Sequence, residues 1–268
     1  MDLAATFGTE TPLIGMVHLP ALPGAPTYEG DRNKLRGRAL TDALELVESG
    51  FDGLLIENFG DTPYYPDDVP KHVVAELTAT LRELGIGIDH PYGVNVLRND
   101  ATAALSVAAA TGGSFIRVNV HTGVRETDQG ILEGSAHETL RLRERLDTDV
   151  AILADVGVKH SAPPTDRDLR TVTAETIERG LADGVIVSGP ATGKAADAET
   201  LKEVVSARNE TAPAVPVFVG SGVTPENAPS LLEYADGAIV GTALKRGGEV
   251  ENRVDPSRAQ ALVDAVRE

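Results

Sequence analysis

Two glycine turns in the last quarter of the chain have residue types that bind phosphate groups. Gly220-Ser221-Gly222 follows one short apolar run, and Gly241-Thr242 follows the next. Glycines let backbone N–H groups approach an anion closely, and a short helix after the second turn would favour negative charge at its start. The same glycines could serve only to turn the chain. Because two such turns end neighbouring runs, we expect them to hold a phosphate, with Gly193 contributing.

A second group of residues is suited to moving protons. Asp155, Lys159 and His160 lie close together after another apolar run. Ionisable side chains clustered in a cavity can have pKa values near neutrality, and a partly desolvated lysine can act as a base or form a Schiff base. Lys159 could equally be an ordinary surface ion-pair partner of Asp155. Both interpretations stay open from the sequence.

Three polar residues with alternate spacing are expected to share one face of a strand. Arg117, Asn119 and His121 should point toward the centre of the molecule. A buried arginine beside an amide needs an anionic or hydrogen-bonding partner, which a substrate or Glu57 could supply. We therefore place Glu57, Arg117 and Asn119 with Asp155 among the candidate catalytic residues. Glu57 and Asp155 could instead bind Mg²⁺, although no dedicated ligand spacing is present.

Polar side chains also follow the other apolar runs. Their positions just beyond the predicted strands suit them to contact a substrate. The expected substrate-binding residues are His18, Asn58, Asn95, Arg98, Asn99, His121, Asp128, Gln129, Ser188 and Thr192.

Eight short runs of Val, Ile and Leu supply the strands that would position these residues. They are almost purely apolar, as is typical of strands buried on both faces. The predicted strands are 13–18, 53–57, 92–96, 115–119, 150–155, 184–188, 217–220 and 238–241. The predicted helices are 34–49, 70–84, 101–111, 135–146, 166–179, 198–209, 225–234 and 256–266. This alternation predicts an α/β fold with a single (β/α)8 TIM-barrel domain over residues 1–268, its core beginning near residue 12.

An open eight-stranded sheet is the alternative architecture. It is disfavoured because no Gly-x-Gly-x-x-Gly turn follows the first predicted strand. The longest irregular stretches are 18–32, 58–70 and 121–134, and each follows a strand. In a barrel, such loops lie at the functional, carboxyl-terminal face, so we expect a covered site.

Composition restricts the partners and the compartment. The net charge of −17 would repel nucleic acid and anionic membranes. There is no Cys, and no apolar stretch approaches 18 residues, so we expect a cytoplasmic protein without integral membrane association or disulfides. The 41 acidic against 24 basic residues indicate either a surface adapted to high salt or an ordinary acidic cytosolic protein.

Several segments together resemble the BtpA/SgcQ family. The resemblance extends over about residues 12–258. It is carried by segments 15–20, 57–61, 93–100 and 127–130, by 154–156 with 158–160, by 188–189 with 192–193, and by the two glycine turns. The resemblance implies a TIM barrel whose phosphate site is similar to those of tryptophan synthase α and phosphoribosylanthranilate isomerase. It implies no settled catalytic residue set, and the chain lacks the Cys that the latter enzyme uses.

Two functions follow from this resemblance and from the residues. The first is an enzyme acting on a small phosphorylated sugar or sugar-like metabolite, by isomerase or by aldolase/lyase chemistry. The second is a non-enzymatic assembly or stability factor for a membrane complex such as photosystem I. An interaction scaffold has no need to bury Arg117, Asn95 and Asp155 around one axis, so we favour the enzyme. We expect a homo-oligomer, the common state of soluble barrels.

Overall fold

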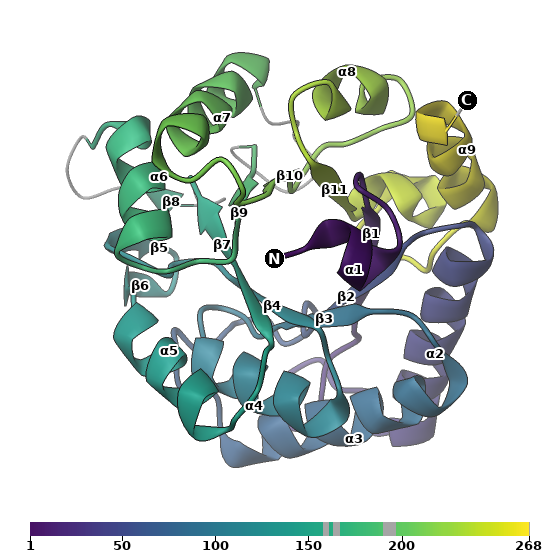
Figure 1. The fold of residues 1–268 in the computed structure, drawn as a ribbon. Coiled ribbons are helices and arrows are strands. Elements are labelled where there is room, and N and C mark those ends of the chain that lie inside the picture. The colour runs from purple at the N-terminus through teal and green to yellow at the C-terminus, as the bar shows by residue number, and fades with distance from the viewer. Residues whose placement is uncertain (158–160, 163–166, 190–196, 268) are drawn as a thin grey trace.

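Eight parallel strands close into a barrel surrounded by helices, as the sequence predicts (Figure 1). The computed structural model describes residues 1–157, 161–162, 167–189 and 197–267. Around the barrel the strand order is β1-β11-β10-β9-β7-β4-β3-β2. The barrel strands are β1 (Leu13–His18), β2 (Gly53–Glu57), β3 (Tyr92–Asn95), β4 (Phe115–Val118), β7 (Ala151–Val156), β9 (Gly184–Val187), β10 (Val217–Val219) and β11 (Gly237–Val240). Each predicted strand end lies within one residue of an observed end.

The helices that follow these strands form the outer layer. They are α2 (Arg32–Glu48), α3 (Lys71–Gly87), α4 (Ala101–Thr111), α5 (Ala136–Arg145), α6 (Leu169–Glu178), α7 (Ala198–Thr211), α8 (Ala228–Leu232) and α9 (Pro256–Arg267). Helix α8 starts three residues later than predicted. The Asn227 side chain accepts a hydrogen bond from the Thr224 amide and donates one to the Gly222 carbonyl, which favours a turn over residues 224–227 instead of helix.

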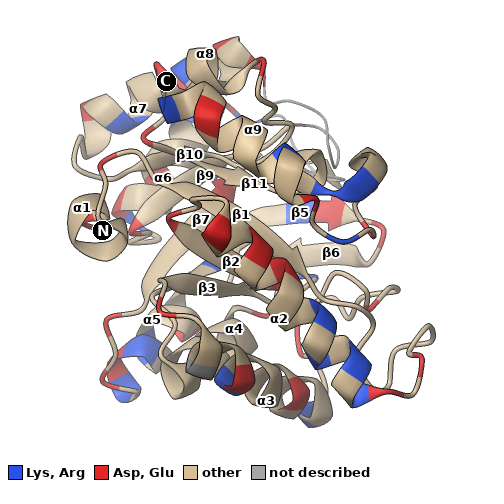
Figure 2. Ribbon diagram, turned by 90° about the vertical axis from the view of Figure 1, so that its right-hand side faces the viewer, with Lys and Arg blue, Asp and Glu red and all other residues tan. Residues whose placement is uncertain are grey.

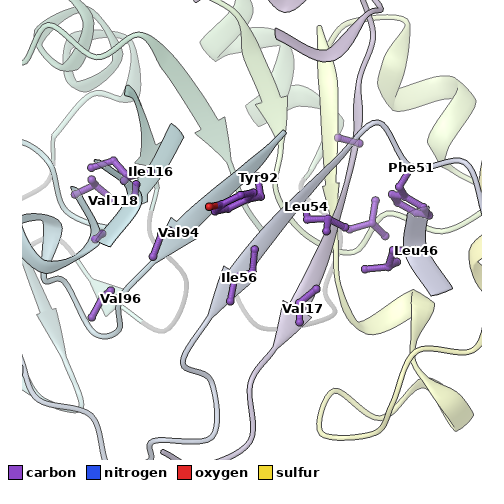
Figure 3. Packing of buried hydrophobic residues seen from close by; sticks show 14 of the residues in the cluster. Val17, Leu46, Phe51, Leu54, Ile56, Tyr92, Val94, Val96, Ile116 and Val118 are labelled. Carbon is purple, nitrogen blue, oxygen red and sulfur yellow. The ribbon is translucent and has the colours of Figure 1, made fainter. Parts of the chain in front are cut away.

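Alternate residues of each strand pack outward against these helices. Val17, Leu54, Ile56, Val94 and Ile116 belong to the largest buried cluster, part of which Figure 3 shows. The two-residue repeat of a strand places the intervening residues on the barrel axis. The strand bounds therefore also determine which side chains can reach a central site.

The barrel interior is apolar at its amino-terminal end. Ile14, Leu55, Phe115 and Phe218 belong to one buried interior cluster. A short helix that we did not predict, α1 (Leu3–Phe7), lies across the centre of the barrel in Figure 1 and contributes to this cluster. The helix has its own signals, because Asp2 caps its first turn and Gly8 adopts a left-handed conformation at its end.

A small antiparallel sheet occupies part of the region that we expected to be irregular. Strands β5 (Val124–Thr127) and β6 (Gly130–Glu133) form a hairpin, and β8 (Ser161–Ala162) pairs with β5. These strands are mostly half-buried or exposed. A search for buried apolar runs therefore does not detect them.

Charged residues lie mainly on the outer helices and loops in the view of Figure 2. Asp and Glu outnumber Lys and Arg, in keeping with the net charge of −17. Among the described residues, none of the helices combines the length and the apolar character needed to cross a membrane.

Candidate functional site at the carboxyl-terminal end of the barrel

A cavity of about 470 Å³ lies beyond the carboxyl ends of the strands. It brings together six of the side chains expected at the site, namely His18, Glu57, Arg98, Arg117, Asn119 and Asp128. Four further lining residues, Met16, Phe59, Tyr64 and Leu97, were not predicted, because apolar and aromatic residues give no distinctive chemical signal in a sequence. We call this space the central cavity.

The floor of the site carries a buried ion pair. The Arg117 Nε donates to Asp155 Oδ2 at 2.8 Å, and Nη2 donates to Oδ1 at 2.9 Å. Burial acts to lower the pKa of the Arg117 guanidinium, but the charge and hydrogen bonds of Asp155, with the charge of Glu57, raise the pKa overall. Because both carboxylate oxygens accept from one guanidinium, Asp155 acts as the counterion of Arg117. This differs from the expected arrangement, in which Glu57 or a substrate would pair with Arg117.

Hydrogen bonds connect this pair to neighbours at the carboxyl ends of three strands, β9, β4 and β3. Ser188 Oγ donates to Asp155 Oδ1 at 3.1 Å, and Asn119 Nδ2 donates to Asp155 Oδ2 at 3.3 Å. Asn95 Nδ2 in turn donates to Asn119 Oδ1 at 3.4 Å. The network holds the guanidinium plane and the Asn119 amide in one orientation beneath the cavity.

Glu57 faces His18 across the first two strands. His18 Nε2 lies 3.7 Å from Glu57 Oε1, and both side chains are more than nine-tenths buried. The Phe59 ring packs at 4.9 Å from the imidazole, centroid to centroid. Within the described residues, His18 and Glu57 are the close acid–base pair on the cavity wall, with Asp155 committed to Arg117.

The first glycine of each predicted phosphate turn borders side chains of the site. A Cβ on Gly220 would lie 2.9 Å from Ser188 Oγ and 2.3 Å from a methyl group of Ile186. A Cβ on Gly241 would lie 3.1 Å from the His18 ring. Close packing therefore explains the glycine at both positions, and both turns adjoin the polar end of the barrel.

The turn that follows β10 is held by side-chain hydrogen bonds. Ser221 is buried, and its Oγ accepts from the Gly189 amide at 2.6 Å. Gly222 has a φ of 63°, which suits glycine, and Asn227 bonds the backbone on either side of Val223. Thr242 begins a short 3₁₀ helix, η1 (Thr242–Leu244), where the sequence suggests a short helix.

A model of the BtpA family matches residues 9–268. The chain belongs to the BtpA family. It is 46% identical to "Photosystem I biogenesis protein BtpA" of Synechocystis, over 100% of this chain and 92% of that protein. It is 49% identical to an uncharacterized protein of Thermococcus kodakarensis, over 96% of this chain and 95% of that protein. The fold is similar to that of N-(5'-phosphoribosyl)anthranilate isomerase from Pyrococcus furiosus, with a TM-score of 0.59 and 14% sequence identity. The similarity covers 96% of this chain and 98% of that chain.

Two asparagines of the BtpA-family motifs hold loops instead of lining the cavity. Asn58 accepts from the Leu97 amide at 2.7 Å and donates to Asp61 at 3.0 Å. Asn99 bonds both backbone groups of Val120. Their side chains position the loops that carry Phe59, Tyr64 and Arg98, so we assign them a supporting place in the site.

His121 does not point toward the barrel axis as expected. Strand β4 ends at Val118, so the alternation does not continue to residue 121. His121 Nε2 bonds the Gly180 carbonyl at 2.8 Å, and burial lowers the pKa of the imidazole. In this BtpA-family chain His121 therefore connects the β4 loop to the segment after α6.

The hairpin of β5 and β6 brings its turn to the central cavity. Asp128 lines the cavity, and Gln129 Nε2 donates to Asp128 Oδ2 at 2.5 Å. Arg125 Nε donates to Ser161 Oγ at 2.9 Å, which fastens the hairpin to β8. The Thr-Asp-Gln-Gly motif thus belongs to a structured element above the site.

Four expected site residues lie outside the described residues. They are Lys159, His160, Thr192 and Gly193. In the described part of the chain, no group of three or more His, Asp or Glu side chains is arranged to hold a metal ion.

A buried lysine next to the eighth-strand turn was not predicted as a special residue. Lys245 is completely buried, and its Nζ donates to the Met16 carbonyl at 3.1 Å and lies 3.9 Å from Asp42 Oδ2. Burial lowers the pKa of Lys245 to about 8, while Asp42 acts to raise it. The lysine connects the backbone of β1 to Asp42 of α2.

Proposed function

We propose that this BtpA-family chain is an enzyme that acts on a small phosphorylated sugar or sugar-like metabolite by isomerase or lyase chemistry. The observation that carries the proposal is the central cavity, where a buried acid–base pair, His18 and Glu57, faces the buried Arg117. Buried charges are costly, so a protein that only presents a surface gains nothing from them. Structurally similar proteins include an enzyme named for a phosphoribosyl compound.

The geometry suits proton transfer next to a carbonyl group. In the proposed isomerisation, the Glu57 carboxylate removes a proton from the carbon beside the carbonyl, and His18 donates a proton to the carbonyl oxygen. Glu57 then gives its proton to the former carbonyl carbon of the enediol. His18 recovers a proton from the hydroxyl on the carbon that was deprotonated, which becomes the new carbonyl. Arg98 and Asp128, which also line the cavity, would orient the hydroxyl groups.

The phosphate is assigned to the turns after β10 and β11. Gly220 and Gly241 approach the side chains of the site closely, so an anion held by turn amides would place the sugar carbons beside His18. Ser221 and Gly222 supply the remaining groups of the first turn, and Thr242 supplies those of the second.

A ligand panel tests this proposal. We expect phosphorylated sugars, but not the unphosphorylated sugars, to raise the melting temperature, since a ligand at about 100 times its Kd adds roughly 2.7 kcal/mol of stability. For a phosphosugar that is turned over, Glu57→Gln should lower kcat by about 100- to 10,000-fold and leave binding of inorganic phosphate unchanged. If no phosphosugar stabilises the protein, the proposal is wrong.

A second candidate function is favoured by one relative. The Synechocystis protein, 46% identical over the whole chain, is named for photosystem I biogenesis. The Thermococcus kodakarensis protein, which is 49% identical, has no name that refers to a photosystem. This second function would be favoured if a membrane-complex subunit co-purified with the protein and no phosphorylated sugar raised its melting temperature.

A further inference from the structure

The imidazole of the candidate acid–base pair packs against an aromatic ring from the loop after β2. The centroid of the Phe59 ring lies 4.9 Å from that of the His18 ring, and the two planes are tilted by 47°. His18 Nε2 lies 3.7 Å from Glu57 Oε1, beyond the usual length of a hydrogen bond. At that separation the ion pair alone does not fix the direction of the imidazole, so the packed ring contributes to it.

The segment that carries Phe59 is attached to the loop after β1. The Gly60 amide donates to the Leu19 carbonyl at 3.0 Å, and Asp61 Oδ1 accepts from the Leu22 amide at 2.7 Å. A Cβ on Gly60 would lie 2.3 Å from a backbone nitrogen of the β1 loop, so the two loops pack backbone against backbone. The phenyl ring is therefore held against the end of β1, where the histidine lies.

Tyr64 holds the same segment by a side-chain hydrogen bond. Its hydroxyl donates to the Phe59 carbonyl at 2.7 Å, and its side chain is half-buried. The next residue is attached to the loop after β3, because the Arg98 amide donates to the Tyr65 carbonyl at 2.9 Å. Tyr64 therefore connects the Phe59 backbone to a second loop of the site.

The Tyr64 hydroxyl is suited to be a permanent donor. Burial raises the pKa of the hydroxyl, the charge of Glu57 raises it further, and the charge of Arg98 acts in the opposite direction. A phenol with a raised pKa stays protonated at neutral pH, so it donates a hydrogen bond and does not act as a base. Its contribution to the site is therefore the contact that it makes with the Phe59 carbonyl.

We propose that Tyr64 is a positioning residue of the acid–base pair. Its hydroxyl fixes the Phe59 backbone, and the Phe59 ring in turn orients the His18 imidazole. The inference rests on the proposed function for the role of the pair, although none of these contacts requires a substrate. Without the hydroxyl, the phenyl ring could shift against the imidazole, and a small displacement of a catalytic group is costly.

NMR signals of the imidazole C–H protons test this proposal without a substrate. An aromatic ring packed on an imidazole shifts these signals, so Phe59→Leu should displace those of His18, which His18→Gln identifies by their loss. Tyr64→Phe should displace the same signals in the same direction. The matched control is Tyr92→Phe at the start of β3, which removes a hydroxyl that donates to the Thr111 carbonyl at 2.6 Å and should leave the His18 signals in place.

A double substitution tests whether Tyr64 acts through Phe59. In the Phe59→Leu background, Tyr64→Phe should displace the His18 signals no further, because the ring that transmits the effect is absent. Residues that act through one another are non-additive in this way. For a phosphosugar that is turned over, Tyr64→Phe should also lower kcat by about 10- to 100-fold with little change in KM. Tyr92→Phe should change neither constant.

The outcomes separate this inference from the proposed function. Unchanged His18 signals in Tyr64→Phe, equal displacement in Tyr92→Phe, or a further displacement in the double variant would overturn the positioning role. Tyr64→Phe keeps the ring and its apolar contacts, so its melting temperature should fall no further than that of Tyr92→Phe. Displaced His18 signals, together with no stabilisation by any phosphosugar, would support the positioning of His18 and reject the proposed function.

Discussion

Residue chemistry in this protein depends on which side chain faces each buried carboxylate. Asp155 accepts two hydrogen bonds from Arg117, whereas Glu57 lies opposite the imidazole of His18. Glu57 lines the central cavity, whereas Asp155 is not among its lining residues. We therefore propose Glu57, ahead of Asp155, as the base.

The buried pair gives a prediction for stability. Asp155→Asn leaves the Arg117 charge buried without its counterion, which should lower the free energy of unfolding by about 3–5 kcal/mol. Urea unfolding followed by circular dichroism measures the change. As a control, Glu210→Gln removes the exposed partner of Arg170 and should barely move the urea midpoint. Equal effects of the two substitutions would contradict the assigned importance of burial.

Lys245 gives a prediction for the dependence of stability on pH. Its pKa is lowered to about 8 in the folded protein, against 10.5 for an ordinary lysine. Between these two values the unfolded chain binds the extra proton, so Lys245 makes stability rise with pH in this window. Relative to Lys245→Met, the wild type should gain about 3 kcal/mol between pH 8 and pH 10.5. Denaturant titrations of both proteins at pH 8 and pH 10.5 measure the free energies of unfolding. If the difference between the two proteins does not change with pH, the pKa of Lys245 is that of an ordinary lysine.

At the scale of elements, α1 closes the end of the barrel opposite the site. Phe7 packs edge-on against Phe115 at 5.9 Å between ring centroids, and Leu3 is buried beside the same interior cluster. The amino-terminal segment therefore contributes to the core although no neighbouring strand precedes it. The polar site lies at the opposite, carboxyl-terminal end, where the strand-end loops and the β5–β6 hairpin border it.

Truncating the buried Phe7 of α1 should lower the stability of the protein without changing ligand binding. Phe7→Ala should lower the free energy of unfolding by about 3–5 kcal/mol, as is typical when a buried phenylalanine is truncated. Ala4→Ser, on the exposed face of the same helix, should have little effect. The affinity for inorganic phosphate should be the same in both variants at 10 °C. A large loss of affinity in Phe7→Ala would contradict the separation of core and site.

At the scale of the whole molecule, the net charge of −17 is the dominant feature. Like charges on a compact surface repel one another and oppose folding. If the surface is adapted to high salt, the melting temperature should rise steadily as KCl is increased from 0.1 M to 2 M, since the screening length falls from about 10 Å to 3 Å or less. Differential scanning calorimetry measures this. If the melting temperature does not rise with KCl, the surface is not adapted to high salt and the acidic composition is ordinary.

Local sequence pattern determined the architecture. Short apolar runs such as 13–18 and 53–57 correspond to β1 and β2, because strands buried on both faces tolerate few polar residues. The same alternation predicted that Arg117 and Asn119 face inward, and both line the central cavity. The family followed from the motifs at the strand ends.

Tertiary structure decided which of these groups meet. The pairing of Arg117 with Asp155, the turn of His121 toward Gly180 and the burial of Lys245 beside Asp42 all join segments far apart in the chain. Such contacts depend on strand register and loop paths, which residue types alone do not specify.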